Sequence, residues 1–129
     1  MPAARRSPFQ YAIVRLIPDL ARGEFLNAGV IIMCRPKRFL GARVHLDEGK
    51  LAALAPGVQP TEVRAHLEAI ERIAAGEPEA GPIAALSFAE RFHWLVAPAS
   101  TIIQVSPVHT GLCSDPLAEL DHLFATLVA

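Results

Sequence analysis

The chain has 129 residues, 52% of them hydrophobic, with twelve basic and thirteen acidic residues and a net charge of −1. This length suits one compact domain that buries its core without disulfides or metals. The balanced charge disfavours nucleic-acid binding, and the longest apolar run, residues 30–34, is far too short for a membrane-spanning helix. The sequence therefore points away from nucleic acids and membranes as partners.

The only local basic excess lies in Arg5-Arg6 and in residues 35–38. Each segment alone is too short to be more than solvated loop charge, but nucleic-acid binding would regain support if basic residues clustered on one face. No apolar segment follows the two N-terminal arginines, so no secretory signal is expected. We therefore predict a cytoplasmic protein in which Cys34 and Cys113 are reduced thiols.

Three strands are predicted in the first part of the chain. Residues 1–8 are expected to form a flexible arm, and residues 9–17, rich in β-branched and aromatic side chains, a strand stopped by a proline. Residues 26–35 form a second strand, antiparallel to the first because the connection is short. A further turn leads to a third strand at residues 39–46. The pattern predicts a three-stranded meander.

Helical signals follow the meander. A short helix is predicted at residues 48–54, and Ser87 with Glu90 forms a capping box that starts another. The last helix begins at Asp115, an N-cap followed by proline. Between the first two, a longer helix ends at a glycine, Gly76, and carries apolar residues at steps of four, three and four: Val63, Leu67, Ile70 and Ala74.

The predicted fold is α+β. Residues 101–106 add a fourth strand, so a small, mainly antiparallel four-stranded sheet packs with three to four helices in one domain, residues 9–129. Both faces of the first two strands are apolar, whereas a sheet covered on one side alternates with polar residues. Either the chain's own helices cover the second face, or a partner protein or a second copy does.

Residues 106–116 carry the densest group of chemically active side chains and read as a loop between a strand and a helix. Free amides at a helix N-terminus attract anions, and His109, Thr110, Gly111 and Ser114 would allow close approach and further hydrogen bonds. Asp115 opposes this, because its carboxylate already fills that terminus. Ligand binding and a rigid turn whose hydroxyls satisfy one another are equally favoured.

His109 is the candidate catalytic residue, as an acid or a base. A Cys113 nucleophile with His109 as its base and Asp115 orienting the imidazole is disfavoured, because the spacing of four between His109 and Cys113 along a loop does not enforce that geometry. A metal site using His122 is also disfavoured, since the close Cys or His pairs of zinc sites are absent. We therefore expect no metal and no cofactor.

Further candidates lie outside that segment. Arg15 sits on an apolar strand face and needs either a carboxylate, which Glu24 or Asp19 could supply, or several carbonyls, although an ion pair there could also flank a site. Asn27, on the second strand and close to a glycine, indicates a bulge or a close backbone approach. A predicted helix edge could pair or stack with a partner, although packing explains it equally well; it carries Arg91 and Trp94.

Several motifs together resemble a known bacterial family. They comprise residues 11–16 with Pro18-Asp19, the RGEF motif with Asn27 and Gly29, the RFHWL motif at residues 91–95, and residues 106–111 with Asp115-Pro116. The chain resembles the family known as domain of unknown function 3037 over nearly its whole length. The resemblance implies a small protein without an established activity, often encoded beside a kinase similar to HipA, the toxin kinase of persistence modules. The family motifs fall on Arg15, Glu24, Asn27, Gly29, Arg91, Trp94, His109, Gly111 and Asp115.

Two functions are carried forward. The first is a non-enzymatic regulatory partner of a HipA-like kinase, docking through an apolar sheet face, which could alternatively form a homodimer. The second is a small enzyme or binding domain for a phosphorylated or carboxylated ligand. There, His109 would act beside an arginine clamp of Arg15 or Arg91, with Asn27 and Glu24 orienting the ligand. The second hypothesis requires these side chains to meet in one pocket.

Overall fold

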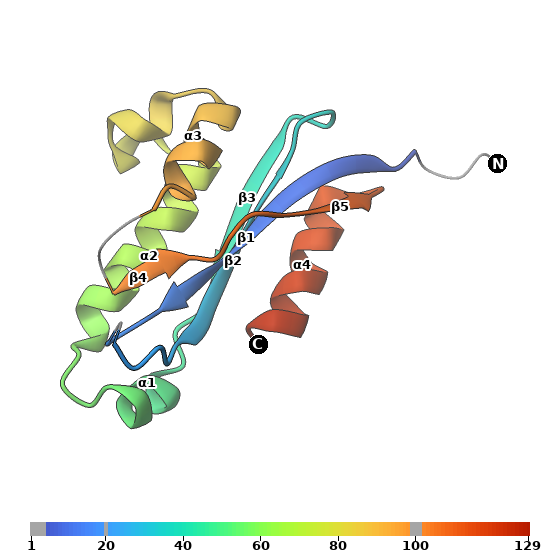
Figure 1. The fold of residues 1–129 in the computed structure, drawn as a ribbon. Helices are drawn as coiled ribbons and strands as arrows, with labels where there is room; N and C mark the ends of the chain where they lie inside the picture. Colours follow the sequence, from blue (N-terminus) through green and yellow to red (C-terminus); the bar gives the residue numbers. More distant parts are fainter. Residues whose placement is uncertain (1–4, 20, 99–101) are drawn as a thin grey trace.

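A computed structural model describes residues 5–19, 21–98 and 102–129. Within them the chain forms an antiparallel sheet with helices on both faces (Figure 1). The meander is β1 (Ser7–Leu16), β2 (Leu26–Cys34) and β3 (Phe39–Val44), in the order β3-β2-β1. Two short strands, β4 (Ile103–Val105) and β5 (His109–Cys113), both pair antiparallel with the outer side of β1. The predicted α+β class is confirmed.

The predicted helices are present with the predicted caps. They are α1 (Glu48–Leu54), α2 (Pro60–Ala75), α3 (Phe88–Leu95) and α4 (Pro116–Leu127), with short 3₁₀ turns η1 (Pro78–Ala80) and η2 (Pro82–Ala85) before α3. The Ser87 hydroxyl accepts from the Glu90 N–H at 3.3 Å, and α2 ends at Gly76, whose φ is 72°. No helix of the described residues is long and apolar enough to span a membrane.

The chain's own helices cover both faces of the sheet, which explains why both are apolar (Figure 1). On one face, Val14, Leu16 and Ile31 pack with α2 and α3. On the other, a smaller cluster that includes Phe9 and Ile32 packs under Leu120 of α4. The simpler of the two predicted explanations is therefore the correct one for most of the sheet.

Two predicted boundaries are corrected. Ser7 and Pro8 belong to β1, so the expected flexible arm of residues 1–8 does not extend that far; residues 1–4 lie outside the described part of the chain. Residues 109–113, expected to be loop, form the fifth strand. Pro107 and Pro116 flank that segment and, with its glycine, gave it the appearance of a loop, but long-range pairing with the start of β1 decides its conformation. Thr101 of the predicted fourth strand also lies outside the described residues.

Ser106 joins β4 to β5, and its hydrogen bonds show to which side each residue of β1 directs its N–H and C=O groups. Its N–H donates to the Ile13 carbonyl, and its hydroxyl accepts from the Ile13 N–H, both at 2.8 Å. Successive residues of a strand direct their N–H and C=O groups to opposite sides. The odd-numbered residues of β1 therefore direct theirs towards β4 and β5, and the even-numbered ones towards β2.

The β1–β2 ladder contains the predicted irregularity. Val14 pairs with Gly29 but Arg15 pairs with Asn27, so β2 has one extra residue at this point. Gly29 is required beside it, because a Cβ atom there would lie 2.9 Å from the Arg43 carbonyl oxygen of β3. The glycine therefore marks a close approach of two backbones, as the sequence indicated.

Candidate functional site

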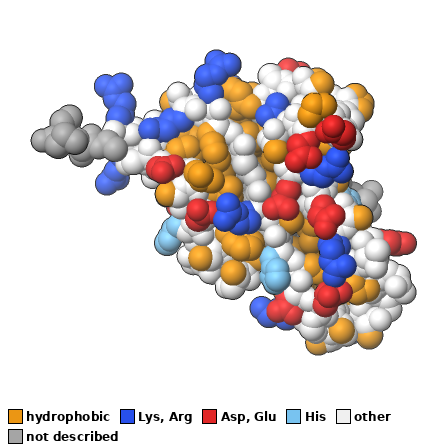
Figure 2. Space-filling view, turned by 180° about the vertical axis from the view of Figure 1, so that it is seen from behind, with side chains coloured by type: hydrophobic (Ala, Val, Ile, Leu, Met, Phe, Trp, Pro, Cys, Tyr) orange, Lys and Arg blue, Asp and Glu red, His pale blue; other side chains and the backbone are white. Residues whose placement is uncertain are grey.

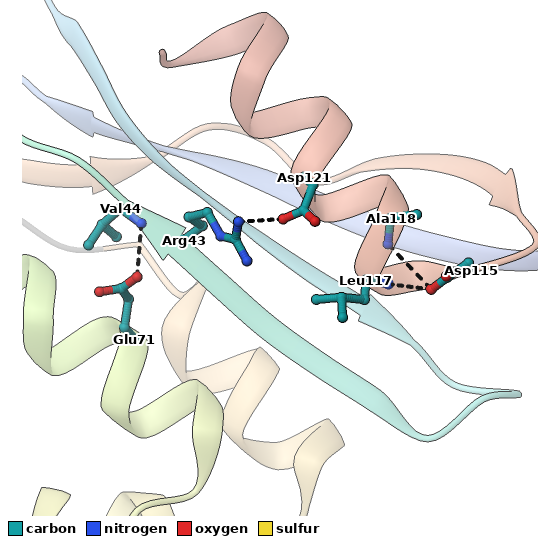
Figure 3. A network of polar contacts seen from close by, with 7 residues as sticks. All are labelled: Arg43, Val44, Glu71, Asp115, Leu117, Ala118 and Asp121. Carbon is teal, nitrogen blue, oxygen red and sulfur yellow. Dashed lines mark hydrogen bonds and ion pairs between the residues drawn. The ribbon is translucent and has the colours of Figure 1, made fainter.

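The two edges of the sheet differ. The β3 edge is closed by a helix on each face (Figure 3). From α2, the Glu71 carboxylate accepts the Val44 N–H at 3.3 Å, and from α4, Asp121 forms an ion pair with Arg43. Side chains therefore satisfy or cover part of the edge that strand pairing leaves open, which protects it from pairing with another chain.

The β5 edge carries no such protection among the described residues. Three of its residues form hydrogen-bonded pairs with odd-numbered residues of β1: His109, Gly111 and Cys113. The backbone N–H and C=O groups of Thr110 and Leu112 therefore point away from the sheet. Both residues are exposed, and the strand carries no lysine or proline to block a further strand.

The inward-facing side chains of β5 anchor it beside α4. The His109 ring lies 5.2 Å from that of Tyr11, and the Phe9 ring lies over Gly111, where a Cβ would be only 2.7 Å away. Cys113 is buried in the same cluster. Because side chains alternate along a strand, Thr110 and Leu112 lie on the other face, where Leu112 is 58% exposed.

Beside Thr110 that face is hollowed by a depression of about 460 Å³, which we call the sheet-end depression. Its floor and walls are mainly apolar, and Leu112 pairs with Pro8 at its rim. The volume is within the range of pockets that hold a small ligand or a side chain. The lining residues are Pro8, Phe9, Gln10, Met33, Arg35, Pro36 and Thr110.

The two short basic segments meet at this end of the sheet. Arg5 and Arg6 immediately precede β1, and Arg35, Lys37 and Arg38 follow β2, its antiparallel neighbour. All five side chains are exposed, and none forms an ion pair with another described residue. Figure 2 shows several basic side chains gathered where the described part of the chain begins. We call these five residues the basic end.

The predicted partner of Arg15 is wrong. Glu24 forms an ion pair with Arg22 instead, and Asp19 accepts from the Ala21 N–H. The Arg15 guanidinium lies 4.4 Å from the centre of the Phe25 ring, with its Nε atom buried and without a hydrogen-bond partner. The connection between β1 and β2 is thus held by a local ion pair that leaves the strand arginine unneutralised.

Asn27, opposite Arg15, fastens the sheet to α4. Its Nδ2 donates to the Leu127 carbonyl at 3.0 Å, near the end of that helix. Its Oδ1 is buried and has no donor. Asn27 therefore has a structural role through its amide nitrogen, and its amide oxygen remains without a hydrogen-bond donor.

Arg91 and Trp94 lie on α3, on the opposite face of the sheet from α4. The Arg91 guanidinium donates to the Leu86 carbonyl at 2.7 Å and to the Ala74 carbonyl at 3.4 Å, so it ties α3 to the end of α2. Trp94 is half exposed beside a hollow between α2, α3 and β4. Arg91 is therefore placed as a packing residue.

The predicted site residues do not converge on one pocket. His109 pairs with Tyr11, four residues along β1 from Arg15 and about 13 Å away along the strand, while Arg91 lies across the sheet. Asp115 caps α4, its carboxylate accepting from the N–H groups of Leu117 and Ala118, so the expected anion site at that N-terminus is filled (Figure 3). Thr110 and Ser114 are exposed to solvent. Their ligand-binding roles stay predictions.

The cysteine pair is buried and reduced. Burial raises the pKa of the Cys113 thiol, and the neighbouring Cys34 adds to the rise, so the reactive thiolate is disfavoured. Cys34 contacts the Pro8 carbonyl at 3.5 Å. Among the described residues no three His, Cys, Asp or Glu side chains are placed to hold a metal ion.

The sequence interpretation missed the strongest surface feature. Leu112 and Glu71 were not singled out, and residues 35–38 were read as solvated loop charge, although the lone leucine beside Gly111 was a usable signal. Residues 11–128 match a family described as "Protein of unknown function (DUF3037)". No curated protein and no solved structure matches the chain.

Proposed function

We propose that this chain, which belongs to the DUF3037 family of proteins of unknown function, is a protein-interaction partner that docks through the outer edge of β5. The carrying observation is the asymmetry of the sheet. Helices α2 and α4 contribute polar side chains to the β3 edge, while β5 leaves the backbone groups of Thr110 and Leu112 open. An unprotected edge is a template for a strand of another protein.

The surrounding surface supports protein recognition more than catalysis. Leu112 and Val108 are large, exposed apolar side chains on and just before β5, and the sheet-end depression lies beside them. Main-chain pairing supplies affinity in such contacts, and pockets for alternate side chains supply specificity. The polar residues expected to form an active site are instead spread over both faces.

The partner we propose is a HipA-like kinase, as the family resemblance implies, with this chain as a non-enzymatic regulator in a toxin–antitoxin module. The homodimer expected through an apolar sheet face stays a prediction. Helices cover most of both sheet faces, so little apolar sheet surface is left for a second copy to contact. We expect any self-association to use the β5 edge or the sheet-end depression.

Co-purification tests the proposal. We expect the tagged chain to retain a co-expressed HipA-like kinase and to change the autophosphorylation of that kinase. Leu112→Asp should abolish both effects. The matched control is Leu117→Asp, since Leu117 is similarly exposed but lies on α4, on the other face of the sheet. A kinase that elutes separately with unchanged activity, or that binds both variants equally, would refute docking at this edge.

One observation supports a second candidate, a binding site for a carboxylated ligand. Arg15 has no carboxylate partner among the described residues, and a partly buried arginine is stabilised by one. Succinate should then raise the unfolding temperature of the wild-type chain and leave that of Arg15→Gln unchanged. Equal shifts in both proteins, or none at millimolar succinate, would eliminate this candidate.

A further inference from the structure

We infer that the segment received by β5 is an extended acidic peptide, bound across the β5 edge and the basic end with an apolar side chain in the sheet-end depression. This inference rests on the proposed function and specifies the chemistry of the partner. Three features of one end of the sheet support it: open backbone groups, an apolar hollow and uncompensated positive charge.

β5 determines how the backbone of the bound peptide would pair with the sheet. Thr110 and Leu112 each offer one N–H and one C=O away from the sheet, spaced for a strand of about five residues. An added strand would alternate its side chains, half towards α4 and half towards the opposite face. Those on the latter face would lie next to the side chains of Leu112 and Thr110, and Thr110 forms the near wall of the depression.

The depression selects one apolar side chain. Met33 is almost fully buried at its floor, and Pro8 and Pro36 are rigid residues that keep its walls in place. At about 460 Å³ and open to solvent, it has room for one apolar side chain. Because an added strand would lie about 9–10 Å from β1, two strand spacings away, that side chain must be a long one such as methionine.

The charge of the partner follows from the basic end. Arg35 lines the depression itself, and Lys37 lies close enough to act electrostatically on Cys113, whose partner in β1 is Ser7. Of the acidic groups at the start of α4, Glu119 also acts electrostatically on Cys113, and Asp115 is occupied as the helix cap. Excess positive charge steers and retains an acidic segment.

A peptide fits this surface better than a nucleic acid or a second copy. Single-stranded nucleic acids need exposed aromatic rings for stacking, and the exposed rings, Phe25 and Trp94, lie away from the basic end. A second copy would present the same positive charge. Four acidic residues of the chain are already paired with its own arginines: Glu24, Glu48, Glu77 and Asp121.

The test measures peptide binding by fluorescence anisotropy. The probe is a labelled peptide of about seven residues with a central methionine for the depression, glutamates two residues before and after it on the same face, where Arg35 lies, and valines at the intervening positions. Comparison ligands are the same peptide with lysine for glutamate and a single-stranded oligothymidylate. We expect the acidic peptide to bind, more weakly as salt rises, and the other two not to bind.

Two variants locate the binding. The double variant Arg35→Glu with Lys37→Glu should lower the affinity for the acidic peptide by about tenfold or more. Thr110→Pro should also weaken it, because it removes an outward N–H while leaving the β1 pairing intact. Lys50→Glu is the matched control: Lys50 is an exposed lysine on α1, and its variant should bind as the wild type does. Circular dichroism and thermal unfolding confirm that each variant is folded.

The outcomes separate this inference from the proposed function. The inference would be overturned if Thr110→Pro and the double variant bound the acidic peptide as tightly as the wild type does. It would also be overturned if the wild type bound oligothymidylate more tightly than the peptide, or did not bind the peptide. If the kinase binds the double variant and Thr110→Pro as it binds the wild type, the inference fails while the kinase partnership stands. If the peptide behaves as expected but the kinase does not co-purify, the kinase partnership fails and the acidic-segment site stands.

Discussion

Gly111→Ala tests how β5 is held in the sheet. A Cβ atom at this position would lie 2.7 Å from Cζ and 2.8 Å from Cε1 of Phe9, whereas carbon atoms pack at about 3.5–4.0 Å. The ring would have to move by roughly 1 Å. It is only 6% exposed and lies 5.9 Å from the Tyr11 ring, so it has little room.

The expected cost is the difference of two terms. Forcing an extra methyl group into a packed cluster costs about 1–3 kcal/mol. Replacing a strand glycine by alanine recovers about 0.5–1 kcal/mol of backbone entropy. Gly111→Ala should therefore lower the free energy of unfolding by up to about 2.5 kcal/mol.

A double-mutant cycle with Phe9→Leu isolates the contact. Leucine lacks the ring atoms that approach Gly111, so in that background Gly111→Ala should be neutral or stabilising, with a coupling of about 1–3 kcal/mol. Urea unfolding gives each free energy. Gly57→Ala is the control, since a Cβ there meets nothing within 4 Å, and it should be neutral or slightly stabilising. Equal effects of Gly111→Ala in both backgrounds would refute the proposed packing.

Three further predictions follow from named contacts. Asp115→Ala removes the cap of α4 and should destabilise the fold by about 1 kcal/mol in urea unfolding, with Asp115→Asn close to wild type. Glu71→Leu leaves the Val44 N–H without its acceptor and should cost about 1–3 kcal/mol, whereas Glu71→Gln should recover most of it; equal losses would contradict a hydrogen-bonding role. Because burial and Cys34 raise the pKa of Cys113 above its unfolded value of about 8.5, its contribution to stability is complete below that pH and is lost as the pH rises through the folded pKa. Stability measured against pH should therefore fall more steeply for the wild type than for Cys113→Ala above that value, and parallel curves would show that the thiol does not contribute.

Local signals predicted most of the fold. The capping box at Ser87, the glycine after α2 and the Asp115-Pro116 helix start depend on neighbours in sequence, and each appears where it was expected. The meander and the bulge near Asn27 also followed from strand patterns and short turns. These features are determined by interactions within a few residues.

The site could not be predicted in the same way. β5 is a strand only because residues about a hundred positions earlier pair with it, and its composition resembles that of a turn. The basic end joins residues 5–6 to residues 35–38 through the β1–β2 pairing, so neither segment revealed it alone. Arg15 lacks an ion-pair partner among the described residues because Arg22, a competing local partner, takes Glu24.

Hydrogen exchange of the β5 amides tests the central claim most directly. In the free protein, the amides of Thr110 and Leu112 should exchange rapidly, while those of Gly111 and Cys113, which face β1, should be protected. On binding the kinase or the acidic peptide, Thr110 and Leu112 should become protected. Protection of both amides in the free chain, or no change on binding while a complex is present, would contradict the account.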